Sequence, residues 1–167
     1  MRQMRMRSGR FWTIIHEVGA VWRRVADLAV AGLTEVGFGE PVSRLLVVSH
    51  QGRGVVDCLT GMVVARDAQE TGDWFDAGRL VAEGIGPLAG QLVNVAGLAG
   101  GELRSVTEDG WRAAHALEGI RLAGPGAQIT VRVGEEVRAF GFSGDDAFFV
   151  VGCSPSLAIF RRGSDAD

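Results

Sequence analysis

The chain has 167 residues, a formal net charge of -3 and 47% hydrophobic residues. This length is enough for one domain with its own hydrophobic core, and the composition excludes extended disorder between the two chain ends. All 17 basic residues are arginine, so the mechanisms that need a phosphate-loop, Schiff-base or general-base lysine are excluded. The bias toward Ala, Val, Gly and Arg is typical of a GC-rich bacterial genome.

The ends of the chain differ in charge. Residues 1–9 are predicted to form a basic flexible tail and residues 163–167 an acidic tail, with a single globular domain over residues 10–162. Charged residues interrupt the apolar stretch after the basic tail, so it does not qualify as a secretory signal, and no window is apolar enough to span a membrane. We therefore expect a cytoplasmic protein, in which Cys58 and Cys153 are buried, reduced thiols; the alternative is one disulfide between two strands.

The first long segment, from Gly9 to Leu33, has apolar residues spaced by three and four positions. This period predicts an amphipathic helix, with Ser8 as its cap and Gly37 and Gly39 marking its end. We expect the helix to pack on a sheet; the alternatives are a helix that binds a membrane surface or a partner.

Two later segments each predict a three-stranded antiparallel meander, because short β-rich runs alternate with turns of Gly, Ser, Thr, Asp and Pro. The predicted strands are 44–49, 54–59 and 62–65 in the first meander and 137–142, 147–151 and 157–160 in the second, with a further strand at 128–133. A weaker third unit lies between them, in a glycine-rich region. The predicted fold class is thus α+β: an N-terminal amphipathic helix packed on a mainly antiparallel, meander-rich β-sheet or sandwich.

Two of the predicted hairpins resemble known repeats. The segment Asp57-Cys-Leu-Thr-Gly-Met-Val-Val64 resembles the D-x-x-T-G-x-V turn of propeller blades, and Phe140-Gly-Phe-Ser-Gly-Asp-Asp with Phe148-Phe-Val-Val-Gly resembles the hairpin of WD40-like blades. Three units are fewer than the four blades of a closed propeller, so we interpret the resemblance as local hairpin chemistry. The whole chain is loosely similar to uncharacterised actinobacterial proteins and to SMI1/KNR4 (SUKH) immunity proteins, from which no residue role is transferred.

Four carboxylates recur at every third position of an acidic loop, at Asp67, Glu70, Asp73 and Asp76. Several oxygen ligands that converge on one point could bind a hard cation, although the spacing is not that of an EF-hand loop. The alternative is a solvated acidic loop that Trp74 and Phe75 anchor on the sheet.

Catalytic residues are sparse. Ser49, His50, Asp57 and Cys58 form the one place where a nucleophile, a base and a carboxylate could meet across a hairpin, but adjacent strand residues point to opposite faces. The Gly141-Phe-Ser-Gly-Asp145 segment lacks the second glycine and the strand-to-helix context of a nucleophile elbow. No cofactor is predicted.

These observations favour a non-catalytic protein-binding or accessory protein of a bacterial system, immunity-like in character, that holds a protein partner or a second copy through a sheet face, an edge strand or the basic helix. Nucleic acid is a less favoured partner, since the chain is acidic overall. The alternative is a small enzyme or a metal- or ligand-binding protein that uses the acidic loop 67–76 together with His50. The candidate partner-binding residues are Arg10, Trp12, Arg23, Arg24, Trp74 and Phe75.

Overall fold

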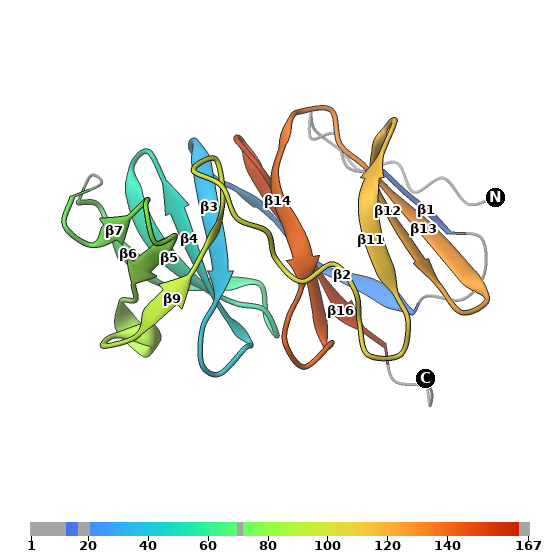
Figure 1. Ribbon diagram of the computed structural model, residues 1–167, viewed down its shortest axis with the longest axis horizontal. Coiled ribbons are helices and arrows are strands. Elements are labelled where there is room, and N and C mark those ends of the chain that lie inside the picture. The colour runs from blue at the N-terminus through green and yellow to red at the C-terminus, as the bar shows by residue number, and fades with distance from the viewer. Residues whose placement is uncertain (1–12, 17–20, 70–71, 164–167) are drawn as a thin grey trace.

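The protein is a row of stacked antiparallel β-sheets. The computed structural model describes residues 13–16, 21–69 and 72–163, and the sheets follow one another along its longest axis (Figure 1). Within these residues the only helix is a short 3-10 turn, η1 (Gly86–Leu88). The predicted α+β class with a packed N-terminal helix is therefore wrong, and the fold is nearly all β.

The middle sheet of the row is buried on both faces. Its strands, in spatial order, are β14 (Val137–Phe142), β15 (Phe148–Cys153), β16 (Ser156–Arg162) and β2 (Trp22–Ala29). Successive side chains of a strand point to opposite faces. Phe149 and Val151 of β15 accordingly enter one hydrophobic cluster, while Phe148 and Val150 enter another. This double burial explains the continuous apolar run that predicted the strand.

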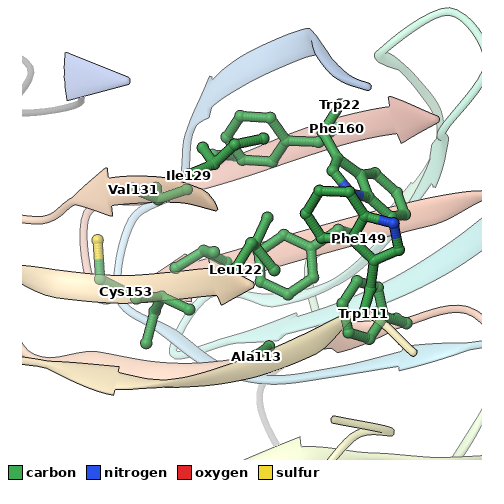
Figure 2. Close-up of a cluster of buried hydrophobic side chains, with 13 residues drawn as sticks. Trp22, Trp111, Ala113, Leu122, Ile129, Val131, Phe149, Cys153 and Phe160 are labelled. Carbon is green, nitrogen blue, oxygen red and sulfur yellow. The ribbon is translucent and has the colours of Figure 1, made fainter. Parts of the chain in front are cut away.

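A four-stranded sheet covers one face of the middle sheet. Its strands are β1 (Thr13–His16), β13 (Ala127–Arg132), β12 (Gly119–Gly124) and β11 (Arg112–Ala116). The cluster between the two sheets is aromatic at its centre. Trp22 lies edge-on to Trp111, with ring centroids 6.0 Å apart (Figure 2). The ring centroids of Phe149 and Phe142 are 4.9 Å apart. Such rings contribute large apolar areas to the core.

A five-stranded sheet covers the other face. Its strands are β10 (Ala96–Gly97), β3 (Leu33–Phe38), β4 (Arg44–Ser49), β5 (Gly52–Asp57) and β6 (Met62–Asp67). β4 has the predicted bounds. It is also buried on both faces, because Leu45 and Val47 face the middle sheet whereas Leu46 and Val48 face a small outer sheet. That outer sheet comprises β7 (Phe75–Asp76), β8 (Val81–Glu83) and β9 (Leu92–Asn94).

The predicted helix over Gly9–Leu33 is replaced, where the structure describes it, by β1, β2 and the start of β3. The helical spacing has a specific cause in β2. Phe160 pairs with Arg24 and Ile159 with Ala26, so Val25 is an extra residue at a β-bulge. The bulge shifts the alternation by one residue, and Val25 and Leu28 both pack on the same cluster although they are three positions apart. In the sequence this spacing is indistinguishable from one face of a helix.

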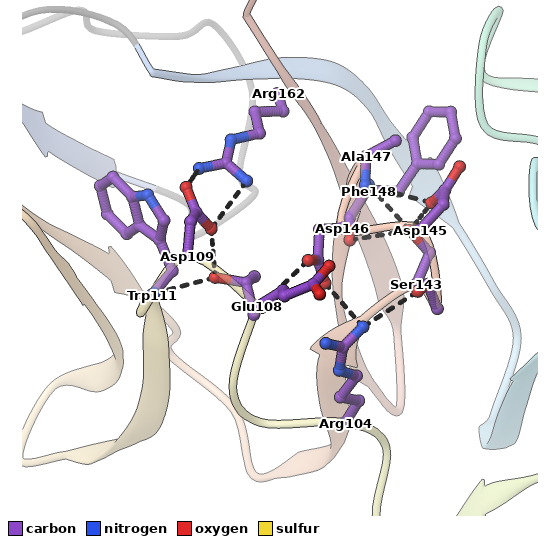
Figure 3. A network of polar contacts seen from close by, with 12 residues as sticks. Arg104, Glu108, Asp109, Trp111, Ser143, Asp145, Asp146, Ala147, Phe148 and Arg162 are labelled. Carbon is purple, nitrogen blue, oxygen red and sulfur yellow. Dashed lines mark hydrogen bonds and ion pairs between the residues drawn. The ribbon is translucent and has the colours of Figure 1, made fainter.

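A long connection, residues 98–111, runs from the five-stranded sheet past β14 to the four-stranded sheet, and polar contacts hold it in place (Figure 3). Arg104 lies 2.7 Å from Asp146 in the β14–β15 turn and donates to the Gly144 carbonyl. Farther along, the Asp109 carboxylate accepts hydrogen bonds from the Thr107 hydroxyl and from the Arg162 guanidinium. The connection is thus tied to the turn and the final strand of the middle sheet.

We expect Phe149→Ala to lower the free energy of unfolding by about 3–5 kcal/mol, because the change removes a fully buried ring and leaves a cavity between two sheets. Denaturant unfolding of the full chain measures this. Leu117→Ala, at a fully exposed side chain, is the control and should change the free energy by less than about 0.5 kcal/mol. Equal effects of the two changes would contradict the burial of the face of β15 that Phe149 occupies.

The hydrogen bonds from Arg162 and Thr107 lower the pKa of Asp109 to about 2, below its ordinary value. A carboxyl whose pKa is lowered by folding stabilises the protein above the pKa of the unfolded chain, about 4, and this contribution is lost as the pH falls toward the folded pKa. Asp109→Asn should therefore lose less stability than the wild type between pH 4 and pH 2. Thermal unfolding across this range measures the difference, and Leu117→Ala, at a fully exposed side chain, should follow the wild-type curve.

Candidate functional site

Two sheet edges that have no further strand beside them among the described residues lie next to each other. β2 is an edge of the middle sheet and β6 is an edge of the five-stranded sheet. They meet at Gly61, where a Cβ atom would lie 2.5 Å from the Cβ of Ala26. Farther along, the end of β2 and the segment after it (Leu28–Ala31) bound a hollow of about 220 Å³ with residues of β4, β5 and β6.

The surface of β6 is unusually apolar for an exposed edge. Met62, Val63 and Val64 are 65%, 37% and 42% exposed, and Leu59 in the preceding turn is also exposed. Beyond the ladder to β5, no backbone hydrogen bond of Val63 to Arg66 is found within the described part of the chain. Natural edge strands are commonly protected by charged residues, by proline or by a β-bulge. The run from Met62 to Ala65 has no charged residue and no proline, and its one such feature is the bulge at Val64.

The hollow owes its shape to a glycine. In the ladder Val47 faces Gly54 and Gly54 faces Arg66, so the middle of this row has no side chain. A Cβ atom at Gly54 would meet only the Ala65 carbonyl oxygen, at 3.3 Å, and the space above it is open. Val47 and Val56 supply apolar walls, while Arg66 is exposed at the rim.

The acidic loop does not bring its carboxylates together where the structure describes it. Asp67 accepts hydrogen bonds from Arg53, at 3.1 and 3.3 Å, and Asp76 accepts one from the Arg79 backbone N–H. A backbone hydrogen bond from Gln69 and the Arg53 side chain lower the pKa of Asp67. No group of three or more His, Cys, Asp or Glu side chains suited to a metal occurs among the described residues. Glu70 lies outside them, so the metal site stays a prediction.

The predicted partner-binding residues are dispersed. Trp74 is buried against the five-stranded sheet, with the Arg53 guanidinium 4.6 Å from its ring centroid, and Phe75 is half-buried beside it. These contacts fit the alternative in which both rings anchor the acidic loop. Arg23 and Arg24 lie on β2, where the first is exposed and the second partly buried. Arg10 and Trp12 lie outside the described residues.

The candidate catalytic residues also separate. His50 is exposed in the β4–β5 turn, where its backbone N–H donates to the Gly32 carbonyl, and its side chain does not line the hollow. Asp57 instead pairs with Arg44 at 3.3 Å, and Cys58 is fully buried. Ser49 does line the hollow, without a histidine.

Sequence reasoning missed Gly54 and Arg66, and it treated Met62–Ala65 only as a strand. The signal for β6 was present, since three consecutive apolar residues at the end of a meander indicate either a covered strand or a free apolar edge. Only the sheet order separates these two cases.

Comparisons of the chain with protein-family profiles, with curated proteins and with solved structures found no match. No helix in the described part of the chain is long and apolar enough to cross a membrane. The arrangement of the site is therefore interpreted from its own geometry.

Both cysteines are free and buried, as predicted. Burial, with the nearby Asp57 carboxylate, raises the pKa of the Cys58 thiol to about 12, and burial also raises that of Cys153. A thiol with a raised pKa stays protonated and unreactive near neutral pH.

We expect neither cysteine to react with Ellman's reagent in the folded protein and both to react in denaturant. Denatured protein without reactive thiols would indicate a disulfide instead.

Proposed function

We propose that this protein is a non-catalytic protein-binding module whose edge strand β6 pairs with an extended strand of a partner. The observation that carries the proposal is the free apolar edge of β6, with Met62, Val63 and Val64 exposed. Addition of a strand to a sheet edge gains backbone hydrogen bonds along its whole length, and side-chain pockets beside the edge supply specificity. An edge with apolar side chains and no protecting charge is suited to such pairing.

The protein-binding role also agrees with the way the remaining polar groups are used. Arg53, Arg104 and Arg162 each form an ion pair with an aspartate of a neighbouring segment. These contacts hold loops and connections on the sheets, which is a structural role. The alternative of an enzyme or metal-binding protein has no comparable support, because the hollow contains one carboxylate, Asp67, and that carboxylate is paired with Arg53.

Val64→Lys is the test of the proposal. Val64 lies at a bulge of β6 and is exposed, so the change should alter stability by less than about 0.5 kcal/mol while placing a charge on the pairing edge. Tagged wild type, Val64→Lys and Leu117→Lys would be isolated from the native host and compared by native mass. We expect the wild type and the Leu117→Lys control to carry a stoichiometric partner or second copy that Val64→Lys lacks.

Two results would contradict the proposal. One is a free monomer in all three preparations. The other is a partner that Val64→Lys retains in full, because binding would then use another surface.

A further inference from the structure

The hollow beside β6 is the feature that can select among extended strands. It lies on the face of the five-stranded sheet that is turned toward the middle sheet. Val63 and Arg66 of β6 are on this face, because they pair with Val56 and Gly54 of β5. A strand added to the free edge of β6 continues the same sheet. Every second side chain of that strand then points toward the same side as Val63 and Arg66.

The size of the hollow favours a side chain over a small-molecule ligand. Sites for cofactors and other small molecules usually measure about 300–1,000 Å³. The volume here is about 220 Å³, and the walls include Val47, Val56 and Val63. One aliphatic side chain of an added strand fits such a space and would lose its contact with water there.

The rim of the hollow is cationic. Arg66 is exposed and has no hydrogen-bond or ion-pair partner within the described part of the chain. The neighbouring carboxylate of Asp67 pairs with Arg53, from which it accepts two hydrogen bonds. The position opposite Arg66 on an added strand is therefore complementary to a carboxylate.

The bulge in β6 determines the spacing between these two positions. Val63 and Arg66 are three residues apart in β6, but they face Val56 and Gly54, which are two apart in β5. A regular strand paired to the other edge of β6 would likewise place its residues i and i+2 opposite Val63 and Arg66.

We infer that the partner strand carries an aliphatic residue that packs on Val63 in the wall of the hollow and, two positions away on the same face, an acidic residue that pairs with Arg66. This inference rests on the proposed function, because it requires that β6 accepts a strand. It adds the chemical pattern of the partner: an aliphatic and an acidic side chain separated by one residue of any type.

The test uses the full-length protein and fluorescent nine-residue peptides of Thr and Ser. One peptide carries Val and Glu two positions apart, a second replaces the Glu by Gln, and a third replaces the Val by Ser. Fluorescence anisotropy measures binding of each. We expect the first peptide to bind more tightly than the third by about tenfold or more, which corresponds to burial of one aliphatic side chain. Against the second peptide we expect a gain of about two- to fivefold that disappears at high salt.

Two protein variants show which residues of β6 are responsible for the two peptide preferences. Val63→Thr keeps a β-branched side chain on the edge strand and should remove the preference for Val over Ser in the peptide; unfolding measurements check that the variant folds. Arg66→Gln keeps an exposed polar side chain and should remove only the preference for Glu over Gln. Leu117→Gln is the matched control and should bind as the wild type.

The outcomes separate this inference from the proposed function. Peptide binding that Val64→Lys abolishes, but that is equal for the three peptides and unchanged by Val63→Thr and Arg66→Gln, would overturn the inference and leave strand addition standing. Absence of binding by every peptide would overturn both. A homodimer that Val64→Lys dissociates would identify a second copy as the occupant of β6 and also overturn the inferred pattern.

Discussion

The burial of the middle sheet on both faces is the constraint on which the rest of the structure depends. β15 cannot expose either face to water, so a sheet must pack on each side of it, and its side chains divide between two clusters by simple alternation. The same arrangement recurs at β4, which is covered by the middle sheet and by the small outer sheet. A row of layers follows from these two strands, and the long connection over residues 98–111 is needed to reach the far end of that row.

Stacking buries faces but leaves edges. In a row of sheets the edge strands β2 and β6 have no neighbour on one side among the described residues, and Gly61, just before β6, lies against Ala26 of β2. The glycine at position 54 leaves room for the hollow that residues of both strands line. The apolar edge, the hollow and the Arg66 cation therefore share one origin, and the proposed binding role uses all three.

The strands and hairpins were accessible from the sequence to a large extent. Arg44–Ser49 and Val137–Phe142 were predicted with their observed bounds, because apolar β-rich runs there are bounded by turn residues. The predicted turn after Phe142 is also present, and in it the Ser143 hydroxyl accepts a hydrogen bond from the Phe148 backbone N–H and donates one to Asp145. The N-terminal helix was wrong: the bulge in β2 brings Val25 and Leu28 to one cluster at helical spacing, while Trp22 of the same strand packs in the opposite cluster. The hollow was missed because Gly54 carries no chemical group that could indicate a site.

The sequence by itself determined that the chain folds around antiparallel meanders, lacks lysine chemistry and keeps two buried thiols, since these follow from local patterns and residue types. Only the tertiary structure decided which strands became edges, where Val25 and Leu28 point, and that Arg53 takes the Asp67 carboxylate while Arg66 remains exposed. The physical reason is that sheet order and bulges depend on pairing between residues far apart in the chain: β2 pairs with β16, and β1 pairs with β13. Local periodicity carries no information about such partners.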